Sequence, residues 1–207
     1  NPPIDSLREN KVMSLKTRFG NLGNILDFDN LTEENIYVLD SPVLTNSQFK
    51  KFKKFFAKKV KVIDCTFDIE KSLKERIESI REEAETAVRQ GSTCLVLSDK
   101  NISNKKASIP SILTVGAVHS HLVKHGLRGY CSLNVECADA MDTHSFAILI
   151  GVGATTVNPY LAIDSIYQRF EKKLFGKSDF ETCVSKFKKS IDAGLLKIMS
   201  KMGISVI

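Results

Sequence analysis

The sequence predicts an α/β protein: an open, mainly parallel sheet with helices on both faces, in three layers, preceded by an irregular N-terminal extension. From residue 36 onward, short apolar segments alternate with amphipathic helical patterns. Most of the intervening helices exceed ten residues, the length that a crossover between parallel strands requires. Segment 93–98 contains a continuous apolar run, which is typical of a strand buried on both faces of a parallel sheet.

The expected elements follow in order along the chain. Strands are predicted at 36–39, 60–63, 93–98 and 131–136. The clearest helix has its apolar residues at steps of three and four, with Asp68 as the expected N-cap and Gly91 as the stop. Its predicted stripe comprises Ile69, Leu73, Ile77, Ile80, Ala84, Ala87 and Val88. Other helices are expected at 47–58, 110–124, 143–150, 159–174 and 179–202.

The chain divides into three expected parts. Residues 1–35 contain two prolines and no sustained period, so we expect an irregular segment that packs on the rest. Residues 36–195 form the α/β domain, and residues 196–207 begin a further connection. The chain lacks an initiator methionine and its last residues read as the start of a strand, so we expect an internal piece of a longer protein.

The composition excludes several protein classes. With 43% hydrophobic and 26% charged residues among 207, the chain is neither a disordered tail, a collagen-like rod nor a disulfide scaffold. Five cysteines without a C-x-x-C pair argue against a disulfide framework and a structural zinc site. We expect a reducing location, cytoplasmic or in a plastid-like organelle. No membrane contact is expected, because no apolar run approaches the roughly 18 to 20 residues of a membrane span.

The net charge of +6 raises the question of a nucleic-acid partner. Seven lysines lie between Lys50 and Lys61, interleaved with phenylalanines that could stack on bases. However, Phe49, Phe52 and Phe56 recur at helical spacing, which favours a buried helix face with solvated lysines around it. We therefore expect no nucleic-acid partner.

Carboxylates follow the predicted strands. In open α/β sheets, ligands bind beyond the carboxyl ends of the strands, so such residues could hold a divalent cation or a ribose hydroxyl. The favoured alternative is that they cap helices and satisfy loop amides, because no phosphate-binding loop accompanies them. The residues of this alternative ligand site are Asp40, Asp64, Asp99 and Glu136.

Other candidate motifs are weak. The glycines of GVG at 151–153 lack the third glycine of a dinucleotide fingerprint and are expected in a tight helix-to-helix connection. His121 and His125 share a helix face as metal ligands would, but the neighbouring Glu of an H-E-x-x-H motif is lacking, so helix-surface or hydrogen-bonded core histidines are favoured. The sequence therefore predicts no catalytic, cofactor-binding or metal-binding residue.

Longer segments show a resemblance to a known family. The chain opens with NPPIDSLRE and then VMSL at 12–15, and later contains SPVL at 41–44, LSD at 97–99 and IPSIL at 109–113. It continues with VGAVH at 115–119, HL at 121–122, GLR at 126–128, GVGA at 151–154 and VNPYLA at 157–162, and ends with GLLKIMSKMGIS at 194–205. Together these segments resemble the central domain of the glutamate synthase large subunit.

The resemblance implies a function for the whole enzyme. Glutamate synthases convert glutamine, 2-oxoglutarate and two electrons into two glutamates. An N-terminal amidotransferase domain releases ammonia, and an FMN-binding barrel with a 3Fe–4S cluster reduces 2-iminoglutarate. The electrons come from NADPH, NADH or ferredoxin, in some enzymes through a small electron-delivering subunit. The central domain is similar to a Rossmann- or flavodoxin-like nucleotide-binding fold without its cofactor.

For this chain, the resemblance implies a non-catalytic domain between the amidotransferase and the FMN barrel that helps to form the ammonia tunnel. Confinement would keep ammonia concentrated between the two sites. On this interpretation, residues 196–207 start the connection into the barrel. The expected interdomain and tunnel residues are Asn1, Pro2, Pro3, Ile4, Asp5, Lys197, Lys201, Met202, Gly203 and Ser205. The alternative hypothesis is a free-standing module that binds a nucleotide or small ligand through the carboxylates at the strand ends.

Overall fold

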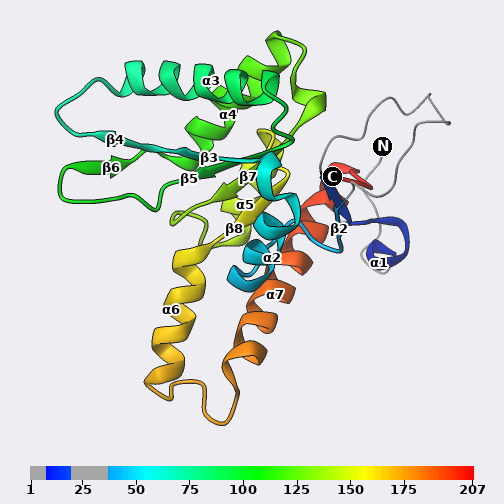
Figure 1. The fold of residues 1–207 in the computed structure, drawn as a ribbon. Helices are drawn as coiled ribbons and strands as arrows, with labels where there is room; N and C mark the ends of the chain where they lie inside the picture. Colours follow the sequence, from blue (N-terminus) through cyan, green and yellow to red (C-terminus); the bar gives the residue numbers. More distant parts are fainter. Residues whose placement is uncertain (1–7, 20–36) are drawn as a thin grey trace.

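A four-stranded parallel sheet forms the centre of the computed structural model, which describes residues 8–19 and 37–207 (Figure 1). All three pairs of neighbouring strands run parallel. The strand order is β3 (Val60–Asp64), β5 (Cys94–Ser98), β7 (Ser132–Glu136) and β8 (Thr156–Asn158). The prediction of a parallel α/β fold is confirmed.

Strand β5 shows why helices cover both faces of the sheet. Its side chains alternate between two hydrophobic clusters. Cys94 and Val96 pack with helix α2 (Asn46–Phe56) on one face. Leu95 and Leu97 belong to the larger core on the other face, to which four helices contribute. These are α3 (Leu73–Arg89), α4 (Ser111–Lys124), α5 (Thr143–Gly151) and α7 (Phe180–Met202).

Helix α2 confirms the interpretation of the lysine-rich stretch. Thr45 and Gln48 form a capping box at its start, each side chain accepting a backbone N–H of the other. Phe49, Phe52 and Phe56 are buried, and most of the lysines around them are exposed. These three rings stabilise the domain core and are not available to stack on bases.

Helix α3 starts later than predicted. Ser72 is its N-cap and accepts a hydrogen bond from the Glu75 backbone N–H. The predicted N-cap Asp68 instead ends strand β4 (Thr66–Asp68), which pairs antiparallel with β6 (Lys106–Ser108). Ile69 is 58% exposed and does not belong to the buried stripe. The stop at Gly91 is confirmed, since this residue adopts a φ of +93°.

One predicted strand lies outside the central sheet, and one strand of that sheet was not predicted. Segment 37–39 does form strand β2 (Tyr37–Leu39), but it pairs antiparallel with β1 (Thr17–Phe19) in a separate small sheet. The fourth strand of the central sheet is β8, which was not predicted because it is only three residues long. The GVG segment therefore connects helix α5 to a strand and not to a helix.

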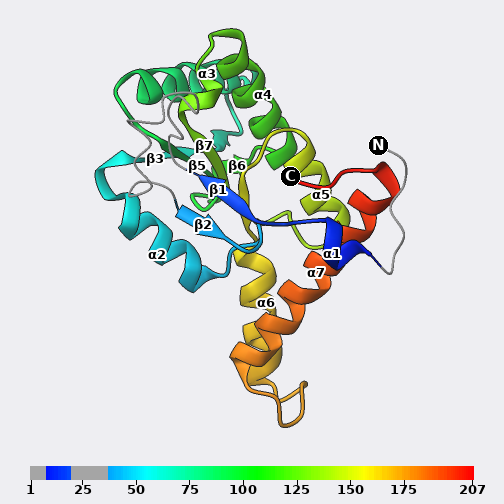
Figure 2. The same cartoon turned by 90° about the vertical axis from the view of Figure 1, so that its right-hand side faces the viewer.

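Helices α6 (Tyr160–Glu171) and α7 (Phe180–Met202) form a hairpin that projects away from the sheet (Figures 1 and 2). The C-terminal half of α7 returns to the main core, where Ile191, Leu195 and Met199 are buried. Gly203 ends α7 in the left-handed conformation, with a φ of 69°. Within the described ranges, no helix combines the length and apolar character needed to cross a bilayer.

The N-cap of α7 gives a pH-dependent prediction. Asp179 accepts hydrogen bonds from the Thr182 backbone N–H at 2.7 Å and hydroxyl at 2.9 Å. These bonds hold the pKa of Asp179 below its ordinary value of 3.8. We expect Asp179→Ala to lower the thermal unfolding midpoint at neutral pH. Because the folded-state pKa is depressed, this difference should disappear as the pH falls through that pKa, below 3.8.

The matched control for this prediction is Asp164→Ala, an exposed aspartate in the interior of α6. Alanine is the best helix former at such a position, so we expect no loss of stability. Midpoints measured by circular dichroism from pH 7 to pH 2.5 would test both variants. Equal midpoints for Asp179→Ala and the unmodified chain at neutral pH would contradict the capping role.

Candidate functional site

The carboxyl edge of the sheet brings together three of the four carboxylates that the sequence singled out. Asp64 ends β3 and lies in register with Ser98 of β5, which in turn lies opposite Glu136 at the end of β7. Asp99 follows β5 directly. This edge is where open α/β sheets bind ligands, so the partners of each carboxylate decide what it can do.

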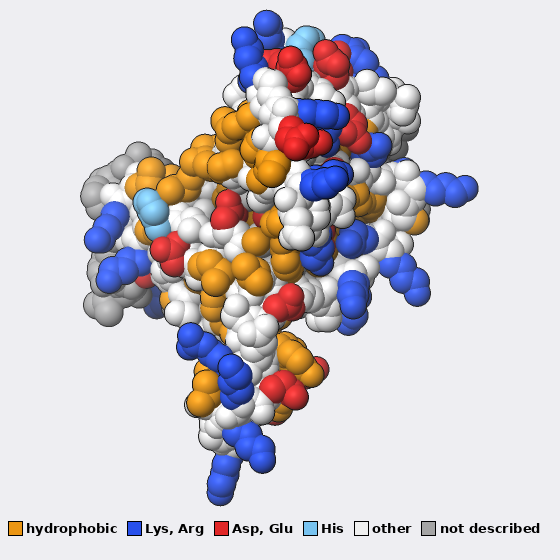
Figure 3. Space-filling model, turned by 90° about the vertical axis from the view of Figure 1, so that its left-hand side faces the viewer, with side chains coloured by type: hydrophobic (Ala, Val, Ile, Leu, Met, Phe, Trp, Pro, Cys, Tyr) orange, Lys and Arg blue, Asp and Glu red, His pale blue; other side chains and the backbone are white. Residues whose placement is uncertain are grey.

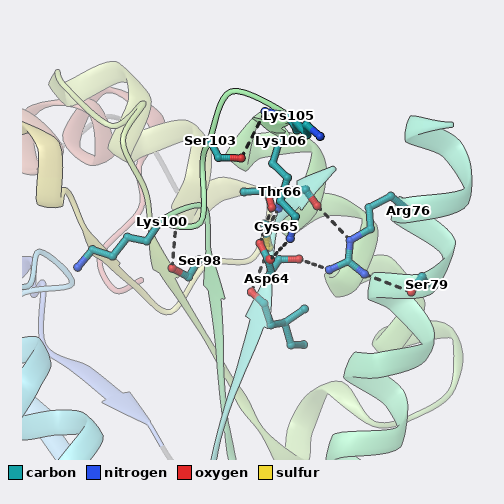
Figure 4. Close-up of polar contacts among 11 residues, drawn as sticks. Asp64, Cys65, Thr66, Arg76, Ser79, Ser98, Lys100, Ser103, Lys105 and Lys106 are labelled. Atoms are coloured by element: carbon teal, nitrogen blue, oxygen red, sulfur yellow. Dashed lines mark hydrogen bonds and ion pairs between the residues drawn. The ribbon is translucent and has the colours of Figure 1, made fainter. Parts of the chain in front are cut away.

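The Asp64 carboxylate forms hydrogen bonds and an ion pair with nearby residues of the chain (Figure 4). One carboxylate oxygen accepts from the Thr66 backbone N–H at 3.0 Å and from the Thr66 hydroxyl at 2.8 Å. The other lies 3.7 Å from the Lys106 ammonium. Burial raises the pKa of Asp64, but hydrogen bonds from Thr66 and Asn101 outweigh it, so the pKa lies below its ordinary value. Arg76 of α3 donates to the backbone carbonyls of Asp64 and Thr66.

Glu136 is buried, with 5% of its side chain exposed. It accepts a hydrogen bond from the Ser98 hydroxyl at 2.7 Å and pairs with the Lys100 ammonium at 2.9 Å. Lys53 of α2 lies 3.8 Å away. A buried carboxylate needs hydrogen-bonding and charged partners, and here they come from β5, from the loop that follows it and from α2. Glu136 therefore ties these elements to the end of β7.

Asp99 is 2% exposed and holds the loop that follows β7. Its Oδ2 accepts from the Ala138 backbone N–H at 2.9 Å and from the Ser108 hydroxyl at 3.3 Å. Burial and the adjacent Asp99 carboxylate raise the pKa of Tyr160, so this phenol stays protonated. The contacts agree with the favoured interpretation that these carboxylates satisfy loop amides and hydroxyls.

Asp40 does not join this edge. It follows β2, which lies outside the parallel sheet. Three residues later, Val43 forms a parallel bridge with Val157 of β8. Asp40 precedes this paired segment, so it lies toward the amino ends of the strands and not at the carboxyl edge. The expectation that Asp40 follows a strand of the main sheet is wrong. The reason is that the segment pairing with β8 lies a few residues further along the chain.

Four of the five cysteines, all but Cys183, are buried and behave as small apolar residues. Burial raises the pKa of Cys65 to about 12 and that of Cys131 to about 11. Burial also raises the pKa of Cys137, which follows the β7 strand. A thiol becomes a nucleophile or a metal ligand as its thiolate, so these three remain unreactive at neutral pH.

The two ends of the described chain meet at one surface (Figure 2). The Ser14 backbone N–H donates to the Ser205 carbonyl at 2.9 Å, and Ser14 forms a parallel bridge with Val206. Helix α1 (Glu9–Val12) packs beside α7. We call this surface the terminal face, formed by residues 12–15 and 198–207 and the adjoining part of α5.

An apolar groove of about 380 Å³ opens on the terminal face. Beside it, Met202 is 64% exposed and Val206 is 63% exposed. Large exposed apolar patches mark protein interaction surfaces more often than isolated exposed side chains do. The groove is lined by Leu15, His144, Ala147, Ile148, Ile150, Gly151, Leu195, Ile198, Met199, Met202, Ile204 and Ile207.

The predicted interdomain and tunnel residues fall in two groups. Asn1, Pro2, Pro3, Ile4 and Asp5 lie outside the described residues. The second group lies on the terminal face or beside it: Lys197 and Lys201 are exposed on the last turns of α7, and Met202 lines the groove. Gly203 is buried at the end of the helix, and the Ser205 carbonyl accepts the hydrogen bond from Ser14. Their part in a tunnel remains a prediction.

A second apolar groove, of about 620 Å³, lies between α3 and α4. Leu73 and Ile77 contribute from α3, and Gly116 and Ala117 from α4. Ile112 and Leu113, at the start of α4, are 45% and 42% exposed. Figure 3 shows apolar side chains gathered on this side of the molecule, with many lysines and arginines along one edge of the view.

Arg128 joins three of the segments that carry the family resemblance, VGAVH at 115–119, GLR at 126–128 and GVGA at 151–154. Its guanidinium donates to the carbonyls of Cys131 at 2.6 Å and Gly153 at 2.9 Å, and to the Thr155 hydroxyl at 3.4 Å. Its Nε donates to His119 Nδ1 at 3.2 Å. One side chain therefore links α4, the 3-10 turn 128–130 and the approach to β8. These hydrogen bonds stabilise the turn that leads into β7 and the loop that leads into β8.

Sequence reasoning also missed a buried polar layer on one face of the sheet. The Asn134 side-chain amide donates to the Leu95 carbonyl and the Ser132 hydroxyl, both at 3.1 Å. The Thr156 hydroxyl donates to the Asn134 side-chain oxygen at 2.6 Å. The signal was present in the alternation of polar and apolar residues along SLNVE at 132–136. A fully bonded polar layer specifies strand register more than it adds stability.

Comparison with known proteins assigns the chain to a family. The profile described as "Glutamate synthase central domain" matches residues 1–207, the whole chain. The chain belongs to this family. The resemblance noted from the sequence motifs is thereby confirmed.

Individual glutamate synthases agree with the assignment. The chain is 52% identical over 210 residues to the glutamate synthase (NADPH) large chain of Azospirillum brasilense, and 41% identical over 215 residues to that of Bacillus subtilis (strain 168). It is 40% identical over 222 residues to the chloroplastic ferredoxin-dependent glutamate synthase of Spinacia oleracea. Each match covers 100% of this chain and 14% of the relative. This glutamate synthase central domain therefore spans about a seventh of the length of its relatives.

Proposed function

We propose that this glutamate synthase central domain links the amidotransferase domain to the FMN domain within one large subunit and helps to enclose the ammonia path between them. The complete enzyme would convert glutamine, 2-oxoglutarate and two electrons into two glutamates. FMN and the 3Fe–4S cluster would be held by the neighbouring barrel, and the chemistry would take place outside this chain.

The pairing of residues 12–15 with the C-terminal residues at the terminal face supports the proposal. Ser14 and Ser205 are joined by a backbone hydrogen bond, so the first described segment and the last residues of the chain lie side by side on this face. Two flanking catalytic domains would then both contact the terminal face. Its groove supplies apolar surface of the kind that domain interfaces bury. Lys197, Lys201 and Met202 lie on this face or beside it and are the residues proposed to border the ammonia path.

The proposed domain limits are 1–35 for the packing segment, 36–195 for the α/β body and 196–207 for the start of the connection. Because α7 runs unbroken to Met202, the proposed connection begins within this helix. The alternative of a free-standing ligand-binding module has less support, since Asp64, Asp99 and Glu136 all bond to the chain itself.

The proposed location is the cytoplasm or a plastid-like organelle, in line with the chloroplastic relatives from plants. Relatives at similar identity are named for NADPH and for ferredoxin. We propose that the electron donor is selected outside the central domain, through a small electron-delivering subunit or ferredoxin.

Met202→Lys in the complete enzyme would test the role of the terminal face. Met202 is 64% exposed, so the substitution should leave the fold of this domain intact while placing a charge at the domain interface. We expect glutamine-dependent glutamate formation to fall severalfold and free ammonia to accumulate from glutamine. Ammonia-dependent glutamate formation should be retained. Both rates and the released ammonia would be measured in the same preparation.

Leu174→Lys is the matched control. Leu174 is 66% exposed, on the loop that joins α6 and α7 at the far tip of the hairpin. Leu174→Lys should leave the ratio of glutamine-dependent to ammonia-dependent glutamate formation unchanged. The proposal would be contradicted if Met202→Lys kept the unmodified ratio and released no extra ammonia, or if Leu174→Lys uncoupled the enzyme equally.

A further inference from the structure

Helices α3 and α4 bring two histidines and a glutamate together at a place that the proposed function does not use. His121 Nε2 lies 2.7 Å from Glu85 Oε2, and His125 Nδ1 lies 3.8 Å from the same oxygen. One ligand atom from each of the three side chains lies within 4.8 Å of the others. The two imidazole rings are 4.3 Å apart between centroids.

The sequence spacing accounts for half of this cluster. His121 and His125 are four residues apart at the end of α4, so they face the same side of the helix. The sequence favours helix-surface or hydrogen-bonded core histidines because the pair lacks the neighbouring Glu of an H-E-x-x-H motif. Glu85 supplies an acidic residue from α3, 36 positions away, because α3 and α4 pack side by side (Figure 1).

The separations suit a tetrahedral transition-metal ion. Zinc binds histidine nitrogen and carboxylate oxygen at about 2.0–2.1 Å, so two ligands of a tetrahedral site lie about 3.3 Å apart. The observed 2.7 and 3.8 Å fall on either side of that value. Small rotations of the side chains would equalise them. The Nδ1 contact of His125 with the His121 carbonyl, at 2.8 Å, would be exchanged for the metal.

Neighbouring groups prepare Glu85 as a ligand. The Arg89 guanidinium donates to Glu85 Oε1 at 2.8 Å, which leaves Oε2 directed at the histidines. His125 is the C-cap of α4, where the negative end of the helix dipole favours a cation.

Solvent access completes the site. The side chains are 19% exposed at His121, 22% at Glu85 and 34% at His125, so an ion can enter and water can occupy the fourth position. Three protein ligands with one open position are the arrangement of zinc sites that bind water or an exogenous ligand. We propose that Glu85, His121 and His125 bind a divalent transition-metal ion, Zn²⁺, with water as the fourth ligand.

The test is metal titration of the 207-residue protein. Isothermal titration calorimetry with ZnCl₂ should show one ion bound per chain, and Co²⁺ should give the visible absorption of tetrahedral coordination. Glu85→Gln and His125→Ala should each weaken zinc binding at least tenfold and abolish the cobalt spectrum. Zinc should raise the unfolding temperature of the unmodified chain but not that of the double variant Glu85→Gln/His125→Ala.

His144→Ala is the control, because it removes an exposed histidine from α5 and should leave zinc affinity unchanged. Circular dichroism of the metal-free variants would confirm that they are folded. The proposal would be overturned by the absence of stoichiometric zinc binding to the unmodified chain. It would also be overturned if folded Glu85→Gln and His125→Ala variants bound zinc as tightly as the unmodified chain.

Discussion

Replacing Arg128 with methionine is expected to lower the free energy of unfolding by about 3 kcal/mol, because buried acceptors lose a charged donor. The guanidinium bonds to the carbonyls of Cys131 and Gly153, to the Thr155 hydroxyl and to His119. Methionine retains much of the aliphatic volume but donates no hydrogen bond. Urea unfolding of the 207-residue chain, followed by circular dichroism, would measure the loss.

Arg89→Met is the matched control for this prediction. The Arg89 side chain is 56% exposed, and within the described part of the chain its one ion pair is with Glu85. We therefore expect the free energy of unfolding to change by less than about 0.5 kcal/mol. A comparable loss for the two variants would show that Arg128 has no special structural role.

Arg128→Met should also change the pKa of His119, which NMR can measure. Burial, and to a lesser extent the Arg128 charge, lower the pKa of His119 from 6.5. The unfolded chain therefore takes up the proton more readily, and stability declines as the pH falls below 6.5. Without Arg128, the pKa of His119 should move up toward 6.5, and this decline should become smaller. An NMR titration of the His119 ring protons would measure the pKa in both chains.

The helices could be predicted because their apolar residues repeat over several turns. Phe49, Phe52 and Phe56 of α2 identify the buried face directly, and the whole length of α4 follows from Pro110 and Gly126 at its ends. At the sheet centre, β5 can be recognised from its apolar run, and β7 from the alternation of polar and apolar residues along it. These are local patterns, so they can be recognised without knowledge of the fold.

The errors arose where pairing with a distant segment decides the structure. Asp68 has the side chain of an N-cap, but its backbone pairs with Lys106 in the β4–β6 ladder, and the helix starts after it. Strand β8 contains three residues and has no period of its own, and its register comes from Asn134 and Val135 of β7. No local signal distinguishes such a segment from a loop.

The candidate sites show the same division. The placement of Asp64, Asp99 and Glu136 at one sheet edge follows from strand polarity alone. The hydrogen bonds that these carboxylates accept from Thr66 and Ala138, and the ion pair with Lys100, depend on loops whose course cannot be predicted from local sequence patterns. Likewise, the spacing of His121 and His125 indicates a shared helix face, whereas the approach of Glu85 required the packing of α3.

Gly153→Ala is expected to destabilise the chain by about 2–4 kcal/mol, from backbone strain and steric overlap together. Gly153 adopts a φ of +118°, which residues with a Cβ rarely take up. An added Cβ would also lie against the His119 ring, only 2.5 Å from its Cγ. Gly151→Ala is the control: nothing lies within 4 Å of a Cβ there, and the residue ends helix α5, so we expect no loss. Urea unfolding would compare the two variants.

The double variant Gly153→Ala/His119→Ala would separate the two causes. Removing the imidazole ring eliminates the overlap but leaves the strained φ. Gly153→Ala should therefore cost less stability in a chain that already carries His119→Ala than in the unmodified chain. We expect a coupling of about 1–2 kcal/mol, within the range found for residues in contact. Strict additivity would show that the backbone conformation alone requires glycine, and an unchanged stability of Gly153→Ala would show that the turn before β8 rearranges freely. That outcome would also weaken the case for Arg128, whose guanidinium binds the carbonyl of the same glycine.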